Sequence, residues 1–145
     1  MLAKLKRYNL NDIRFDYPDH WTLDDEEQTE RGKSVAVYAP SGAFWLVTKQ
    51  EGDDDLQAIA DEALSAMRDE YDDVEAEPVE EKLAGCKLLG YNLSFVFLDL
   101  PCTSLIRCAT SAGSTYLILC ESEDSDFDDL ESTFQTITAS LLKKK

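Results

Sequence analysis

The sequence predicts an α+β fold in one domain that spans residues 1–145. Apolar and polar residues alternate in the segments 13–23, 34–48 and 88–120, as is typical of half-buried strands. Apolar residues recur with a helical period in the segments 54–73 and 126–142. We therefore expect an antiparallel sheet of six to eight strands with both helices packed on one face.

The first half of the chain predicts four strands and a helix. Residues 13–17 alternate until Pro18 ends the strand, and the aromatic and aliphatic pattern resumes at Trp21. Residues 34–40 and 43–48 are rich in β-branched and aromatic side chains and form a predicted hairpin. The helix that follows has aspartates at its start, where carboxylates cap free N–H groups. Its apolar stripe consists of Leu56, Ile59, Ala60, Ala63, Met67, Tyr71 and Val74.

The second half predicts an edge strand with Pro78, a three-stranded meander and a terminal helix. Turns centred on residues 100–101 and 112–113 define a register for the meander. In that register one face is wholly apolar, and it carries Leu93, Phe95, Ile106, Cys108, Leu117 and Leu119. The terminal helix is predicted to start at a Ser125 cap, with acids in its first turn and lysines at its end, as the helix dipole favours.

Charge limits the classes of partner. The net charge of −16 repels phosphate backbones and anionic lipid surfaces, so we expect no nucleic acid and no membrane, and a basic protein as partner. The basic N-terminal residues precede no apolar run of a secretory signal, and no apolar segment has the length of a membrane span. We expect a cytoplasmic protein.

The residue types that carry most chemistry are scarce. His20 is the single histidine, which excludes sites built from several histidines, and we expect it in an exposed turn. The four cysteines form no C-x-x-C pair and predict buried, reduced thiols. Carboxylates at Asp124, Asp126 and Asp128 have the spacing of a calcium loop. Its glycine and glutamate positions hold Asp129 and Gln135, so a helix start is the better interpretation. We assign no catalytic, cofactor-binding or metal residue, and expect no enzyme and no cofactor.

Four aromatic residues could form an interaction surface: Trp21, Tyr38, Trp45 and Tyr116. The predicted hairpin around Tyr38 and Trp45 is its centre, because aromatic side chains dominate interface energetics. The alternative is that these rings belong to the core, where aromatic residues of strands usually pack.

Two segments carry a resemblance to a known family. The string Ile13-Arg-Phe-Asp-Tyr-Pro-Asp-His-Trp21 resembles the first strand and turn of the PsbP-like superfamily. The ending Phe134-Gln-Thr-Ile-Thr-Ala-Ser-Leu141 is similar to the family's terminal helix. The superfamily includes the photosystem II extrinsic proteins, the Ran-binding import factor Mog, DcrB-like bacterial proteins and secretion-effector chaperones. The resemblance implies an α+β sandwich and non-catalytic binding, and it assigns no functional residue to this chain.

These observations predict a non-catalytic cytosolic protein-interaction module or chaperone-like adaptor, either monomeric or a weak homo-oligomer. The alternative is an acidic cation-binding protein or a carboxylate-based hydrolase. That alternative predicts a concave pocket in which acids with perturbed pKa values converge.

Overall fold

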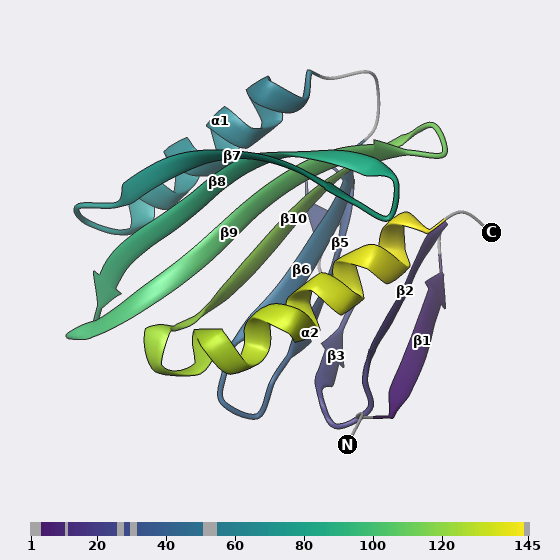
Figure 1. Cartoon of the computed structure of the whole chain (residues 1–145), viewed down its shortest axis with the longest axis horizontal. Helices are drawn as coiled ribbons and strands as arrows, with labels where there is room; N and C mark the ends of the chain where they lie inside the picture. The colour runs from purple at the N-terminus through teal and green to yellow at the C-terminus, as the bar shows by residue number, and fades with distance from the viewer. Residues whose placement is uncertain (1–3, 11, 26–27, 30–31, 51–54, 144–145) are drawn as a thin grey trace.

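The computed structural model describes residues 4–10, 12–25, 28–29, 32–50 and 55–143. In these ranges the strands of the main antiparallel sheet run in the order β3-β5-β6-β10-β9-β8-β7, with the short β4 beside β5, and β1 and β2 form a separate pair (Figure 1). The elements are β1 (Leu5–Leu10), β2 (Ile13–Pro18), β3 (Thr22–Asp24), β4 (Gln28–Thr29), β5 (Gly32–Tyr38), β6 (Phe44–Gln50), α1 (Leu56–Glu70), β7 (Glu75–Leu83), β8 (Cys86–Phe97), β9 (Leu100–Ser111), β10 (Ser114–Glu123) and α2 (Asp124–Leu142). The predicted α+β class and antiparallel sheet are confirmed.

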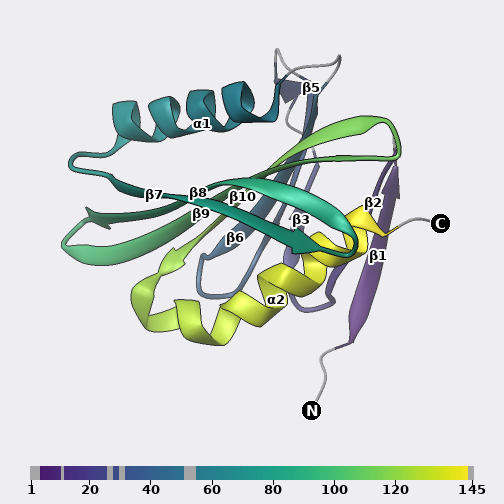
Figure 2. The ribbon, with the colours of Figure 1, turned by 45° about the horizontal axis from the view of Figure 1, so that its top comes forward.

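The two helices lie on opposite faces of the sheet, so the expectation that both pack on one face is wrong (Figure 2). The central strands carry apolar side chains on both faces. In β10, Leu117 packs in the cluster under α1, whereas the next residue, Ile118, packs in the cluster under α2. Because neighbouring side chains of a strand point to opposite faces, two separate cores result.

The core under α1 uses the apolar face that the sequence predicts. Leu93, Phe95, Ile106 and Cys108 are buried there, and Leu117 and Leu119 pack against them. The helix contributes the buried side chains of Ile59, Ala60, Leu64 and Met67. The predicted set of six residues on one face is therefore confirmed, with one helix packed on it.

The core under α2 is larger and includes the β1–β2 pair. Trp45 lies at its centre, with its ring centroid 4.7 Å from that of Phe15 and its Nε1 donating to Thr138 Oγ1 at 2.9 Å. The Asp16 backbone N–H donates to Ser140 Oγ at 2.7 Å, which joins β2 to α2. The helix buries Phe134, Ile137, Thr138, Leu141 and Leu142 on this side.

The β8–β9 turn lies two residues before its predicted position. Its central residues are Leu98 and Asp99, with φ of 52° and 66°, and Leu89 pairs with Cys108 where Leu93 was expected. The four-residue shift is even, so it leaves every side chain on its predicted face. Pro101 does not break the sheet, because it pairs with Val96 in β8 and the ladder to β10 begins only at Cys102.

Three local boundaries differ from the expectations. Helix α1 begins at Leu56 with Asp55 as its cap, whose carboxylate accepts from the Gln57 N–H at 3.3 Å. Helix α2 starts directly after β10, so Ser125 lies inside its first turn; the cap residue is Glu123, which makes no side-chain capping bond. Asp124 accepts from the Thr103 hydroxyl at 2.6 Å. Strand β1 was not predicted, because Tyr8 is its only buried residue and no alternation results.

Three of the four cysteines and the histidine lie where the sequence predicts. All four cysteines are free; Cys102, Cys108 and Cys120 are buried and Cys86 is half-buried. Burial raises the pKa of the Cys108 thiol to about 12, which keeps it protonated and unreactive. His20 is exposed in the turn closed by the Trp21 N–H and the Pro18 carbonyl at 3.0 Å. Among the described residues, neither helix is apolar enough over sufficient length to cross a bilayer.

Candidate interaction site

The structure places most of the predicted aromatic surface in the core. Trp45 is fully buried, and Trp21 and Tyr116 are nearly so. The prediction that these three residues form a surface is wrong, because β2, β6, β10 and α2 enclose them in one cluster. Tyr38 is exposed and contacts Phe44 at 5.8 Å between ring centroids, so a role for Tyr38 in binding stays a prediction.

Exposed apolar side chains gather instead at the β8–β9 tip, which we define as residues 96–101. Leu98 is 78% exposed and Phe97 is 48% exposed, and Val96 and Leu100 beside them are exposed as well. Four of the seven large apolar residues that are exposed in the described part of the chain lie in this one turn. Scattered apolar residues are ordinary on a surface, whereas a contiguous group marks an interaction site.

The backbone of the tip is also unfavourable for its sequence. A two-residue hairpin with φ positive at both central residues favours asparagine and glycine. Leu98 occupies the first position at φ 52°, where a large side chain costs about 1 kcal/mol. The chain thus keeps an exposed leucine at a position where a small polar residue would be more stable. The presence of leucine at position 98 is therefore not explained by folding stability, whereas a role in binding would explain it.

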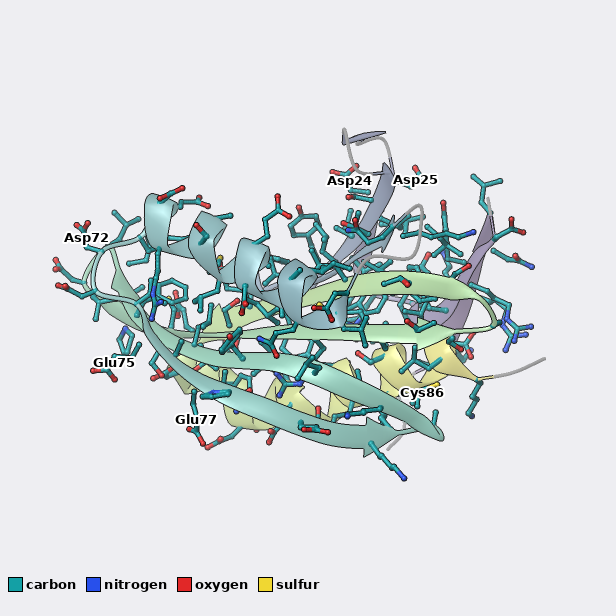
Figure 3. All side chains as sticks on the ribbon, turned by 90° about the horizontal axis from the view of Figure 1, so that it is seen from above. Asp24, Asp25, Asp72, Glu75, Glu77 and Cys86 are labelled. Carbon is teal, nitrogen blue, oxygen red and sulfur yellow. The ribbon has the colours of Figure 1, made fainter. Side chains whose placement is uncertain are left out.

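Acidic side chains flank the tip on both sides. A groove of about 410 Å³ beside it is lined by Asp72, Asp73, Glu75 and Asp124 together with Phe95, Val96 and Pro101. Figure 3 shows Asp72 projecting from this end of the molecule, just before β7, and Glu75 and Glu77 projecting from β7 itself. A second groove of about 210 Å³ on the other side is lined by Phe97, Leu98 and Leu100 with the acids Glu121, Glu123 and Asp126. Among the described residues, neither groove has a lysine or an arginine in its wall.

Glu121 is the acid of this region with the most perturbed titration. Burial, and secondly the nearby Glu70 carboxylate, raise the pKa of Glu121 to about 7. The Tyr71 side chain stacks on Phe95 at 4.4 Å and meets Phe97 edge-on at 5.4 Å between ring centroids. Burial, followed by Glu121 and Glu70, raises the pKa of Tyr71 to about 12. Among the described residues, no cationic side chain forms an ion pair with Glu121.

Replacement of Glu121 by glutamine should change how stability depends on pH. The folded chain keeps this carboxyl protonated up to about pH 7, whereas in the unfolded chain it titrates near 4.5. Unfolding therefore releases a proton in this window, and the stability of the wild-type chain falls as the pH rises from 4.5 to 7. We expect Glu121→Gln to be more stable than wild type by on the order of 2 kcal/mol at pH 8, and equally stable at pH 4.5.

Urea unfolding from pH 4.5 to 8 measures this difference. Glu123→Gln is the control, because Glu123 is an exposed acid two residues along the same strand. A stability difference between Glu121→Gln and wild type that stays constant with pH would contradict the expectation.

Arg107 is a buried cation on the face of the sheet that α2 covers, and it has a structural role. Arg107 Nε donates to Glu81 Oε1 at 2.8 Å, and its Nη2 donates to Asn92 Oδ1 at 2.7 Å. Its Nη1 donates to the backbone carbonyls of Tyr91 and Ile106. These bonds tie β7, β8 and β9 together and engage four of the five N–H donors of the guanidinium. Within the described ranges, no three histidine, cysteine, aspartate or glutamate residues are placed to hold a metal ion.

Sequence reasoning missed the β8–β9 tip because it placed residues 96–98 in a strand and the turn at Pro101. The signal was nevertheless present. The residues Val96-Phe-Leu98 and Leu100 form an apolar group interrupted only by Asp99. A strand with one buried face needs an apolar side chain only at every second position, so three consecutive apolar residues indicate that at least one of them is exposed.

Comparisons with known proteins extend the description of the fold. No protein-family model matches the sequence. No curated protein matches it significantly.

Solved structures do match. The cyanobacterial PsbP (CyanoP) from Synechocystis superposes with a TM-score of 0.64 at 17% identity, over 97% of this chain and 92% of its own. A protein of unknown function from Pseudomonas aeruginosa, described as a putative regulator, matches over 99% of both chains with a TM-score of 0.55 and 9% identity. LpqN of Mycobacterium tuberculosis, involved in cell envelope biogenesis, matches over 92% of this chain and 87% of its own, with a TM-score of 0.55 and 14% identity. Identities this low establish a shared architecture and carry no function. The resemblance seen in the opening and closing segments is thereby confirmed at the level of the fold, and the chain has the PsbP-like fold.

Proposed function

We propose that this protein is a non-catalytic interaction module of the chaperone-like adaptor type. Its partner presents a segment with both apolar and cationic side chains to the β8–β9 tip. The exposed apolar group of the tip is the observation that carries the proposal, because Leu98 and its neighbours contact water at a cost in stability.

The apolar side chains would supply most of the affinity. Full burial of a leucine or phenylalanine side chain is worth about 1.5–3 kcal/mol. Phe97, Leu98 and Leu100 all line one groove, so a single apolar segment could contact the three together. Two or three such contacts supply about 3–9 kcal/mol before the cost of association, so micromolar affinity also needs ionic contacts.

The acids decide which apolar partner fits. In the part of the chain that the structure describes, both grooves beside the tip carry carboxylates and no basic side chain, and the whole chain has a net charge of −16. Such a field attracts a basic segment and speeds its association. It repels an anionic lipid surface, which otherwise would be the natural target of an exposed apolar loop. The four free cysteines support a reducing compartment such as the cytosol.

A pair of matched variants tests the proposal. Leu98 and Ala112 both occupy the first position of a two-residue hairpin turn with φ of 52°, at opposite ends of β9. Asparagine tolerates this conformation, so Leu98→Asn and Ala112→Asn should each be at least as stable as wild type. Only Leu98→Asn removes an apolar side chain from the tip. We expect it to weaken partner binding at least about tenfold, since burial of one leucine is worth that much.

The measurement is quantitative capture from native lysate on wild-type, Leu98→Asn and Ala112→Asn protein, with mass spectrometry of what is retained. Support requires a protein that is retained by wild type and by Ala112→Asn, lost from Leu98→Asn, and released by high salt as an ionic contact requires. Equal retention on all three proteins would overturn the proposal. Sedimentation of wild type, but not Leu98→Asn, with phosphatidylcholine vesicles would overturn it in favour of a membrane contact.

A further inference from the structure

A hollow lies at the other end of β9 from the tip. It has a volume of about 620 Å³, which is within the range of sites for small molecules. The β1–β2 pair, the end of β6, the β9–β10 turn and the end of α2 form its walls. Its lining includes Asn9, Asp12, Arg14, Lys49, Ser111, Ala112, Ser114, Tyr116, Leu141 and Lys143.

The charge of this hollow is opposite to that of the rest of the chain. Acids outnumber bases 30 to 14 in the sequence, yet the described residues that line the hollow include three bases, Arg14, Lys49 and Lys143, and one acid, Asp12. The bases come from β2, the end of β6 and the end of α2, so the fold brings them together from distant parts of the sequence. A local excess of positive charge in a strongly acidic protein concentrates anions at this place.

Lys49 is a half-buried base of the hollow with a single weak ion pair. Its side chain is only 20% exposed, and among the described residues its one ion pair is with Asp12, with Nζ 3.8 Å from Oδ2. The Asp12 side chain is itself 91% exposed, so water screens this contact. An ammonium group offers three N–H donors, and the Asp12 contact at 3.8 Å is too long to satisfy any of them well. An anion in the hollow would supply closer acceptors.

Tyr116 and Arg14 are further donors around the hollow. The Tyr116 side chain is 7% exposed and lines the hollow, and it forms no side-chain hydrogen bond within the described ranges. Arg14 lies near Asp16, but the Asp16 carboxylate is held by Arg7 through two bonds of 2.8 and 3.2 Å. The Ser111 hydroxyl is occupied, because it donates to the Leu142 carbonyl at 3.3 Å.

We propose that this hollow, which we call the basic hollow, binds a small organic anion through a carboxylate or phosphate group held by Lys49, Arg14 and the Tyr116 hydroxyl. Lys and Arg side chains together with a phenol hydroxyl are donors that suit the oxygens of either group. The volume exceeds that of an inorganic ion, so the ligand has an organic body that lies against Leu141. The site is separate from the β8–β9 tip and does not depend on the function proposed for it.

Nuclear magnetic resonance titration with three probes tests the proposal: citrate, inorganic phosphate, and glycerol as a neutral compound. We expect one of the two anions, at millimolar concentration, to shift the amide signals of residues 49 and 111–116 in a saturable way. Glycerol and sodium chloride of equal ionic strength should not. The anion that saturates at the lower concentration identifies the chemical group, carboxylate or phosphate.

Three variants and a control locate the effect. Lys49→Gln and Arg14→Gln should each weaken anion binding at least about tenfold, as loss of a charge-assisted contact requires. Tyr116→Phe removes one hydroxyl and should weaken it less. Lys87→Gln is the control, because Lys87 is exposed on β8 and pairs with Glu80 at 2.6 Å away from the hollow. Equal affinity of Lys49→Gln and Lys87→Gln, with both folded by their amide spectra, would overturn the proposal. So would the absence of saturable shifts with both anions.

Discussion

Gly90→Ala is expected to lower the free energy of unfolding by about 4 kcal/mol or more, or to prevent folding. A Cβ atom at Gly90 would lie 1.7 Å from the backbone carbonyl oxygen of Ile106 in the adjacent strand. No side chain can rotate to relieve this contact. Strand β9 lies between β8 and β10, so it cannot withdraw from β8 without breaking its ladder to β10.

Gly113→Ala is the matched control for this prediction. Gly113 has φ of +81° and open space where its Cβ would be, so alanine there meets backbone strain without a clash. We expect it to cost about 1–2 kcal/mol. Urea unfolding followed by circular dichroism measures both variants. If Gly90→Ala lost no more stability than Gly113→Ala, β8 and β9 would not approach each other as the structure shows.

Trp45→Ala is expected to cost about 3–5 kcal/mol, a large fraction of the stability of a typical domain. Trp45 is fully buried at the junction of β6, β2 and α2, where it packs on Phe15 and donates to Thr138. Alanine leaves a cavity as large as the indole and an unpaired buried hydroxyl. Trp45→Phe keeps a ring but not the N–H donor, and should lose about 1–3 kcal/mol.

The comparison with Tyr38→Ala decides whether Trp45 belongs to the core or to a surface. Tyr38 is 38% exposed and pairs with Trp45's neighbour, Phe44, across the β5–β6 hairpin. Its removal should cost about 1 kcal/mol or less, as is usual for a partly exposed side chain. Chemical denaturation monitored by circular dichroism gives all three values. A smaller loss for Trp45→Ala than for Tyr38→Ala would place Trp45 on the surface, as the sequence alone suggested.

These expected effects keep structural and functional residues apart. Gly90 and Trp45 hold the strands and layers in place, and substitutions there would abolish binding by unfolding the chain. The side chains of Leu98, Glu121 and Lys49 contribute little to the stability of the fold or lower it. A loss of binding at these positions, with stability kept, therefore reports on contacts with a ligand or partner.

The periodicity of the sequence determined most of the elements and the face of each strand residue. Strands with period two and two amphipathic helical stripes are local properties, which can be read without knowing the neighbours. The same holds for the turn at residues 112–113, where Gly113 adopts a positive φ that glycine permits at no cost. Even the shifted register at Leu98 left the predicted faces intact, because the shift was even.

Only the tertiary structure decided which helix covers which face. The central strands are apolar on both faces, so the pattern in β10 is equally compatible with a helix on either one. Packing of β2 and α2 around Trp45 covers one face of the sheet, and α1 covers the other face. The candidate sites follow the same logic. The basic hollow joins β2, the end of β6 and the end of α2, and Leu98 reaches water only because the turn closes before Pro101. Such groupings depend on distances across the fold, which no local pattern contains.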